Sequence, residues 1–351
     1  MFFSAKKKEV VGVDLGSSSV KLVHLKEQKG GYVLQNIGVA PLPPEAVVDN
    51  TIMDSASIVE VIRGLLGSLG IKVGEAAVSV SGNSVIIRKI VLPAMSVEEL
   101  EDQIQWEAEQ YIPFDINDVN LDFQVLGPDS VDPGKMHVLL VASKKDIIND
   151  YIAVFSEAGL KLVVIDVDSF ALQNAFEFNY QPDPDDVVAL INIGANVMNI
   201  NVVKDGISLF TRDVQVGGSQ YSEEIQRQFA VNAEEAERIK VTHSTEDMHL
   251  LDDVISRVNE NLAIEIRRSL DFYSANAIES KITKIYLGGG VAKAHLLLES
   301  VEQRLDIPVE ILDPFRSITY NENSFDSEYL KEIAPVAVVA VGLAMRRAGD
   351  K

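Results

Sequence analysis

The sequence contains no cysteine among its 351 residues. This absence excludes disulfide bonds, thiol catalysis and cysteine-ligated zinc, and it is typical of a protein of the reducing cytoplasm. Histidine is scarce as well, and the nearest pair, His243 and His249, lacks the spacing of a metal site. We therefore expect no metal site built from histidine side chains.

Positive charge is also in short supply. Lysine and arginine number 31 against 53 aspartates and glutamates, which gives a formal net charge of -22. Nucleic acids need a basic surface for affinity, so this balance argues against a nucleic-acid partner. A phosphate ligand would have to be held locally, by backbone N–H groups and a few cations.

Long apolar runs are missing too. The longest late run, from Ala334 to Met345, is well short of the roughly 20 residues that span a bilayer. Met1 to Lys8 lacks the long apolar region of a secretory signal. We expect a cytoplasmic protein, and 351 residues favour two domains, each able to bury a core.

Two similar segments stand about half the chain apart. The first runs from Val11 to Leu22, and the second runs from Leu190 to Ile200. In each, an apolar strand ends in a polar residue, a glycine follows two positions later, and a polar turn leads into a second strand. The repeat predicts two related lobes that offer hairpins to a shared ligand.

The strands expected around these segments extend the repeat. Strands 10–15, 20–25 and 32–37 in the first half are matched by 187–193, 197–203 and 207–212 in the second. Between them, the pattern predicts a compact α+β unit with strands 85–92, 120–126, 135–142 and 161–166 and helices 97–111 and 146–158. The Pro- and Asp-rich segment 179–186 is the expected linker.

The rest of the second half reads as mainly helical. Periodicity and capping residues predict helices at 219–229, after Asn232, and at 251–276. A strand at 282–287, a helix at 294–305 and a buried helix at 335–345 complete the expectation.

The first hairpin has the chemistry of a phosphate loop. Gly16 permits a tight turn, and Ser17, Ser18 and Ser19 supply hydroxyl and N–H donors. Lys21 adds a positive charge, and Asp14 could hold a hydrated Mg²⁺. A plain hairpin turn with a solvated aspartate explains this motif alone equally well.

The second hairpin offers Gly194, Ala195 and Asn196 to the same phosphates, but Asn192 stands where the first hairpin has its acid. An amide carries no charge, so it orients a water less strongly. Two glycine clusters strengthen the pattern, because they let a nucleotide approach bare backbone near a helix N-terminus. These are Gly288, Gly289 and Gly290, expected to open a helix, and the weaker pair Gly217 and Gly218.

Taken in order, these motifs resemble the actin/Hsp70/sugar-kinase ATPase superfamily and, within it, the FtsA-like PilM family of type IV pilus assembly proteins. The residues that carry the closer resemblance are Asp14–Lys21, Pro41–Pro44, Glu107–Pro113, Gly217–Gly218 with Glu223–Arg227, and Gly342–Arg346. The fold implied is a two-lobed α/β, actin-like (ribonuclease H-like) fold with an α+β subdomain inserted in lobe one.

The resemblance implies domain limits. The first-lobe core would be 1–84, completed by 160–186 and 334–351. The inserted subdomain would be 85–159, and the second lobe would be 187–333.

The resemblance also implies ATP and Mg²⁺ between the lobes. The two phosphate loops map onto Asp14, Gly16, Ser17, Ser18, Ser19 and Lys21, and onto Asn192, Gly194 and Asn196. Asp168 would orient the attacking water, and Gly288, Gly289 and Gly290 would flank the adenine. Arg267 and Arg268 would contact adenosine or phosphate, although a solvated helix face explains them equally well. Because Asn192 and Asp168 replace the usual Asp and Glu, we expect tight binding with slow or absent hydrolysis.

A partner surface is expected on the insert. On helix 97–111, Trp106 points away from the apolar stripe, which suits an anchor for a partner as well as it suits packing within this chain. The resemblance implies that a groove between the first subdomain and the inserted one holds the N-terminal cytoplasmic tail of a PilN-like inner-membrane protein. The chain would then be peripheral to the membrane through that partner. The alternatives are an FtsA-like filament-forming cell-division ATPase and a sugar or carboxylate kinase.

Overall fold

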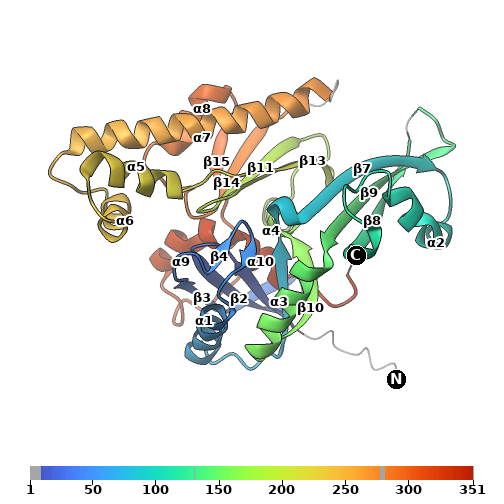
Figure 1. Ribbon diagram of the computed structural model, residues 1–351, viewed down its shortest axis with the longest axis horizontal. Helices are drawn as coiled ribbons and strands as arrows, with labels where there is room; N and C mark the ends of the chain where they lie inside the picture. The colour runs from blue at the N-terminus through green and yellow to red at the C-terminus, as the bar shows by residue number, and fades with distance from the viewer. Residues whose placement is uncertain (1–8, 130, 277–280, 351) are drawn as a thin grey trace.

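The computed structural model describes residues 9–129, 131–276 and 281–350; Met1 to Lys8, weighed above as a signal, lie outside them. Two five-stranded sheets form the two lobes, and a three-stranded sheet projects from their side (Figure 1). Among the described residues, no helix combines the length and apolarity that crossing a membrane requires.

The first sheet has the order β10-β6-β1-β2-β3. In that order its strands are Lys161–Val167, Glu75–Val80, Val11–Leu15, Ser19–Gln28 and Gly31–Pro41. The pairs β1–β2 and β2–β3 are antiparallel, whereas β6 pairs in parallel with both β1 and β10. Parallel neighbours need crossover connections, and here the chain returns from β3 to β6, the parallel neighbour of β1, through α1 (Ser55–Ser68).

The second sheet repeats this topology strand for strand. Its order is β13-β12-β11-β14-β15, with strands Ile207–Val214, Met198–Lys204, Val187–Ile193, Lys284–Gly288 and Val309–Ile311. Again the first two pairings along the chain are antiparallel and the last two are parallel. The repeat predicted from the two hairpins is thus confirmed over whole sheets.

Two helices pack between the lobe sheets, namely α4 (Asp168–Tyr180) and α10 (Val338–Ala344), which follows a short 3-10 turn, η3 (Ala334–Ala337). Their side chains share one core with β2, β3 and β11. The contact is close, because a Cβ on Gly342 would lie 1.8 Å from the carbonyl oxygen of Ala171. The buried C-terminal helix is confirmed, in two pieces.

The projecting sheet has the order β7-β9-β8, built from Val85–Pro93, Lys135–Lys144 and Val119–Pro128. Helix α2 (Val97–Ala108) covers one of its faces, and Ser96 with Glu99 forms the predicted capping box. The helix ends at Ala108 instead of 111. Helix α3 (Lys145–Glu157) packs into the core of the first lobe and not onto this sheet. The domain limits stay a prediction.

The remaining elements surround the second sheet and close the first. Helices α5 (Ser219–Phe229), α6 (Ala233–Thr242), α7 (Met248–Asn276) and α8 (Leu297–Leu305) belong to the second lobe, where α7 runs along its outer side (Figure 1). The hairpin β4 (Val47–Val48) with β5 (Thr51–Ile52) and the helix α9 (Ser327–Ile333) complete the described structure.

The expected linker 179–186 begins too early. Asn179 lies inside α4, is 4% exposed, and bonds through its side chain to Ala175 and Ser317. The extended connection therefore starts only after Tyr180, and 179 and 180 belong to the core between the lobes.

Candidate functional site

The two hairpins face each other across a cleft between the lobes. The enclosed space measures about 60 Å³. Twelve of the predicted residues line it: Asp14, Gly16, Ser17, Ser18, Lys21, Asp168, Asn192, Gly194, Ala195, Asn196, Gly289 and Gly290. Ligand pockets usually measure about 300–1,000 Å³, so a nucleotide would require this cleft to open. Ser19, Gly217, Gly218, Gly288, Arg268 and Trp106 do not line it.

The first hairpin is closed by its own lysine. The Gly16 N–H donates to the carbonyl oxygen of Ser19 at 3.1 Å, and Lys21 Nζ lies 3.3 Å from Asp14 Oδ2. A Cβ on Gly16 would lie 2.9 Å from Lys21 Nζ, so the ammonium group sits directly over the bare turn. Lys21 thus neutralises Asp14, the carboxylate that a hydrated Mg²⁺ would require.

The glycine pair Gly217–Gly218 supports the second hairpin from behind. The Gly218 N–H donates to the carbonyl oxygen of Gly194 at 2.9 Å, and the Ser219 N–H donates to that of Ala195 at 2.8 Å. A Cβ on Gly217 would lie 2.4 Å from the Gly194 oxygen. The pair therefore positions the second loop, and α5 begins beside it at Ser219, as predicted.

The triple glycine does not open a helix, contrary to our expectation. Gly288 ends β14 and faces the core, turns follow, and α8 begins only at Leu297. Gly289 has φ +92° and would bring a Cβ to 2.3 Å from the Ile193 oxygen, which excludes other residues there. The glycines thus let this segment pass close behind the second hairpin, with Gly289 and Gly290 at the cleft.

Asp168 begins α4 and points into the cleft. Burial raises the pKa of its carboxyl to about 6, and the nearby charge of Asp14 adds to this shift. The hydroxyls of Ser79 and Ser81 act in the opposite direction. An acid with a pKa near neutrality in a cleft has the properties of a proton-transfer or water-orienting group.

We expect Asp168→Asn to stabilise the protein at neutral pH. The folded state binds the proton of Asp168 more tightly than the unfolded state. Ionised Asp168 therefore lowers the free energy of unfolding, and this cost grows as the pH rises from about 4 to about 6. The gain should be roughly 1–3 kcal/mol at about pH 7.5 and smaller at about pH 5, measured by urea unfolding. Asp150→Asn on the exposed surface of α3 is the control, and an equal gain at both pH values would refute the account.

A hydrogen-bonded relay leads from the second hairpin across to the first lobe. Asn192 Nδ2 donates to Asn199 Oδ1 at 3.0 Å, and Asn199 Nδ2 donates to Asp213 Oδ1 at 2.9 Å. Asp213 in turn accepts the backbone N–H of Gly82. Burial raises the pKa of Asp213, while its bonds to Asn199 and Gly82 lower it. Gly82 lies between β6 and β7, where the projecting sheet leaves the first lobe.

A second contact reaches the same junction from the cleft. Asn50, which lines the cleft, donates to Ser81 Oγ at 2.7 Å. It has φ +62° and follows Asp49 with φ +48°, which is the geometry of a two-residue turn between β4 and β5. Sequence reasoning missed Asn50, although an Asp-Asn pair between β-branched residues is a hairpin signal.

Arg267, Arg268 and Trp106 lie elsewhere. Arg268 pairs with Glu265, and Arg267 bonds to Asp271 and to the carbonyl oxygen of Arg304. Trp106 lies opposite the buried stripe of α2, as predicted, and is 74% exposed, which the sequence left open. The roles proposed for them stay predictions.

One histidine cluster was not foreseen from spacing. His243, Asp252 and His295 bring their ligand atoms within 4.8 Å of one another, and His243 Nε2 lies 3.2 Å from Asp252 Oδ1. Two imidazoles and a carboxylate are ligands that zinc accepts. The three residues come from α7 and from two turns far apart in the sequence, so no local sequence pattern predicts the cluster.

A groove of about 410 Å³ lies beside the projecting sheet, between β8 and β10. It is lined by residues 122–126 of β8, by 165–167 of β10 and by side chains of α4, among them Phe170 and Asn174. Five consecutive residues of a strand point alternately to both faces, so the groove runs along the edge of β8. Both β8 and β10 are edge strands of their sheets. Asn174 Nδ2 is buried there and has no hydrogen-bond partner among the residues that the structure describes.

Comparison with known proteins identifies the fold and a family. The family model described as type IV pilus assembly protein PilM matches residues 12–348. The solved PilM-PilN type IV pilus biogenesis complex contains a chain that is 30% identical, with a TM-score of 0.87, over 97% of this chain and 98% of that one. Cell division protein FtsA of Bacillus subtilis (strain 168) is 26% identical over 78% of this chain and 67% of its own length.

A more distant structure shares the architecture alone. MreB 5 of Spiroplasma citri, solved with AMPPNP bound, is 11% identical with a TM-score of 0.51, over 95% of this chain and 94% of that one. The predicted two-lobed, actin-like α/β fold is thus confirmed.

Proposed function

Because the chain belongs to the type IV pilus assembly protein PilM family, we propose that it is an ATP-binding adaptor of pilus assembly. In this proposal it binds the N-terminal cytoplasmic tail of a PilN-like inner-membrane protein and hydrolyses ATP slowly or not at all. It would work in the cytoplasm at the inner-membrane face, held there through its partner.

The relay from Asn192 to Gly82 carries the proposal. It begins at the second hairpin, where phosphate would bind, and ends at the junction from which the projecting sheet departs. A ligand that moved Asn192 would change the hydrogen-bond partner of Asn199. Through Asp213 it would then change the hydrogen bond that the Gly82 N–H donates. Such differential contacts are what coupling between two sites requires.

The groove between β8 and β10 is where we place the tail. An extended segment can add to an exposed sheet edge through main-chain hydrogen bonds, and here two edges face one groove. A peptide carbonyl would also satisfy the buried Asn174 Nδ2. Apolar side chains of the tail would meet Phe170, which belongs to none of the hydrophobic cores.

The test is binding of a labelled peptide with the sequence of a PilN-like tail. Phe170→Glu should weaken binding at least about tenfold, because it puts a charge where Phe170 offers an apolar contact. Phe272→Glu is the matched control, since Phe272 on α7 is 59% exposed and lies outside this groove. If both variants bind like the wild type, the tail does not occupy the β8–β10 groove.

For the nucleotide, the proposal assigns the phosphates to the two hairpins and Mg²⁺ to Asp14 through water. The first hairpin supplies the acid, and Lys21 would have to exchange its present bond to Asp14 for one to phosphate. ATP supplies phosphate charge that draws donors from both lobes. The glycine contacts at Gly217 and Gly289 would keep the second loop in place while the cleft opens.

We expect steady-state ATP turnover to stay below about 1 s⁻¹, the low end of ordinary enzymes. The physical reason is the neutral amide of Asn192, which is already engaged with Asn199, together with the short side chain of Asp168. Phosphate release with saturating MgATP measures the rate. Turnover well above this value would contradict the assignment as a binding switch.

A further inference from the structure

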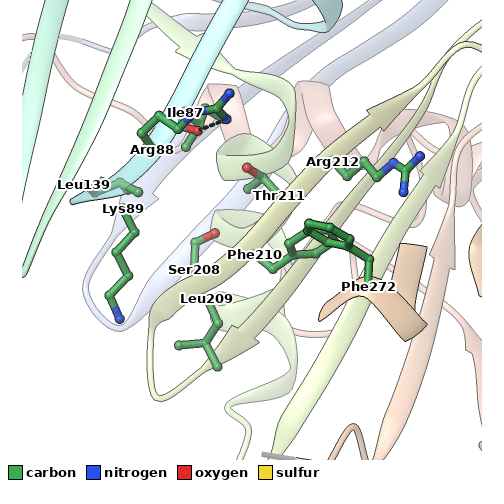
Figure 2. Close-up of a pocket in the computed structure, with 10 residues that line it drawn as sticks. All are labelled: Ile87, Arg88, Lys89, Leu139, Ser208, Leu209, Phe210, Thr211, Arg212 and Phe272. Atoms are coloured by element: carbon green, nitrogen blue, oxygen red, sulfur yellow. Dashed lines mark hydrogen bonds between the residues drawn. The ribbon is translucent and has the colours of Figure 1, made fainter. Parts of the chain in front are cut away.

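A second groove adjoins the first along the opposite edge of the projecting sheet, facing the second lobe. Figure 2 shows it between β7 and β13, and its volume is about 580 Å³. The lining residues are Ile87, Arg88, Lys89, Leu139, Ser208, Leu209, Phe210, Thr211, Arg212 and Phe272. Leu139 and Ser208 line the β8–β10 groove as well, so the two grooves are neighbours.

The lining pattern shows that this groove also runs along strand edges. Residues 208–212 of β13 and 87–89 of β7 line it consecutively, although side chains along a strand alternate between faces. Each of these strands is the last of its sheet among the described residues. Five residues of β13 extend over about 16 Å, which matches a peptide strand of roughly five residues.

The charge in this groove is opposite to that of the whole chain. Arg88, Lys89 and Arg212 are exposed lining residues, and no acidic side chain lines the groove. None of the three forms an ion pair within the described part of the chain; Arg88 bonds only to the carbonyl oxygen of Ile87. Three cations that pair with no described acidic residue, in a chain of net charge -22, form a local positive field.

We propose that the β7–β13 groove binds an extended acidic segment of a partner protein by strand addition. Main-chain groups of the segment would pair with the edge of β7 or β13. Its acidic side chains would meet Arg88, Lys89 and Arg212. Its alternate side chains would pack on Phe210 and Phe272, whose ring centroids lie 6.0 Å apart. This site adjoins the one proposed for the tail, with which it shares Leu139 and Ser208.

The two grooves differ in the charge they select. The β8–β10 groove carries Asp122, Asp166 and Glu177, with Arg346 as its one lining cation, and Arg346 already pairs with Asp166. An acidic segment would be repelled there and attracted along the opposite edge of the same sheet. Electrostatic complementarity of this kind decides which partner binds where.

The experiment measures fluorescence anisotropy with the full chain and two labelled decapeptides, one alternating Glu and Val and the other alternating Lys and Val. The acidic peptide should bind saturably, more weakly as salt rises. Reversing two cations with Arg88→Glu and Arg212→Glu should weaken its binding at least about tenfold. Lys29→Glu with Lys72→Glu, two exposed cations outside the groove, is the control with the same change in net charge and should leave binding unchanged.

Three results would overturn this proposal. The acidic peptide could bind no better than the basic one, the double reversal in the groove could have no more effect than its control, or Phe170→Glu could abolish binding as fully as the reversal does. The last outcome would mean that one continuous groove serves a single ligand. The first two bear only on this proposal, so it can fail while the binding of the PilN-like tail stands.

Discussion

Replacement of Gly342 by alanine is expected to prevent the protein from folding. The added Cβ would lie 1.8 Å from the carbonyl oxygen of Ala171 in α4, and backbone cannot move aside as a flexible side chain can. Because α4 and α10 together join the cores of the two lobes, the strain falls on the centre of the molecule. The loss should exceed about 4 kcal/mol, which soluble yield and thermal unfolding would reveal.

A glycine elsewhere gives the matched control for this substitution. Gly64 lies inside helix α1, is exposed, and would bring its Cβ within 4 Å of nothing. Gly64→Ala should therefore stabilise the protein by about 0.5–1 kcal/mol, since alanine favours helix. A Gly342→Ala protein as stable as the wild type would show that α4 and α10 are not packed as described.

Replacement of Asn199 by leucine is expected to separate nucleotide binding from tail binding. Asn199 is 2% exposed and is the middle of the relay, bonded to both Asn192 and Asp213. Leucine removes both bonds and leaves Asp213 with Gly82 alone, at a cost of roughly 1–3 kcal/mol. The tail should still bind, but its affinity should no longer change when MgATP is added.

Asn201→Leu controls for the loss of stability. Asn201 lies on the same strand, is 0% exposed, and bonds to Ser169, Gln173 and Ser208, outside the relay. It should cost as much stability while preserving the effect of ATP on the tail. Equal responses to ATP in the Asn199→Leu and wild-type proteins would show that the relay carries no coupling.

The sequence predicted those parts of the fold that are written in local patterns. The hairpins after Asp14 and Asn192 are strands of alternating or continuous apolar residues with glycine turns, so their strands and their repetition were recognisable. The capping box at Ser96 and the position of Trp106 opposite the apolar stripe were recognisable for the same reason. The structure of a motif confined to about ten residues is determined by those residues, so it can be recognised from the sequence.

What the sequence concealed depends on distant residues. Helix α4 buries Ser169, Gln173 and Asn179 along with its apolar residues, so it shows no apolar stripe, and its end was taken for a linker. The triple glycine resembles a helix-opening loop, but its conformation depends on its close contact with the backbone of Ile193. The relay joins Asp213 to Gly82, and no periodicity connects two positions so far apart.

The central claim is that nucleotide in the cleft controls a partner site at the projecting sheet. The most direct measurement is the affinity of the wild-type chain for a PilN-like tail peptide, determined with and without MgATP. The account predicts binding in at least one state and a difference of roughly 5- to 150-fold between the two, the usual range of allosteric coupling. Equal affinity with and without MgATP, in a protein shown to bind the nucleotide, would contradict it.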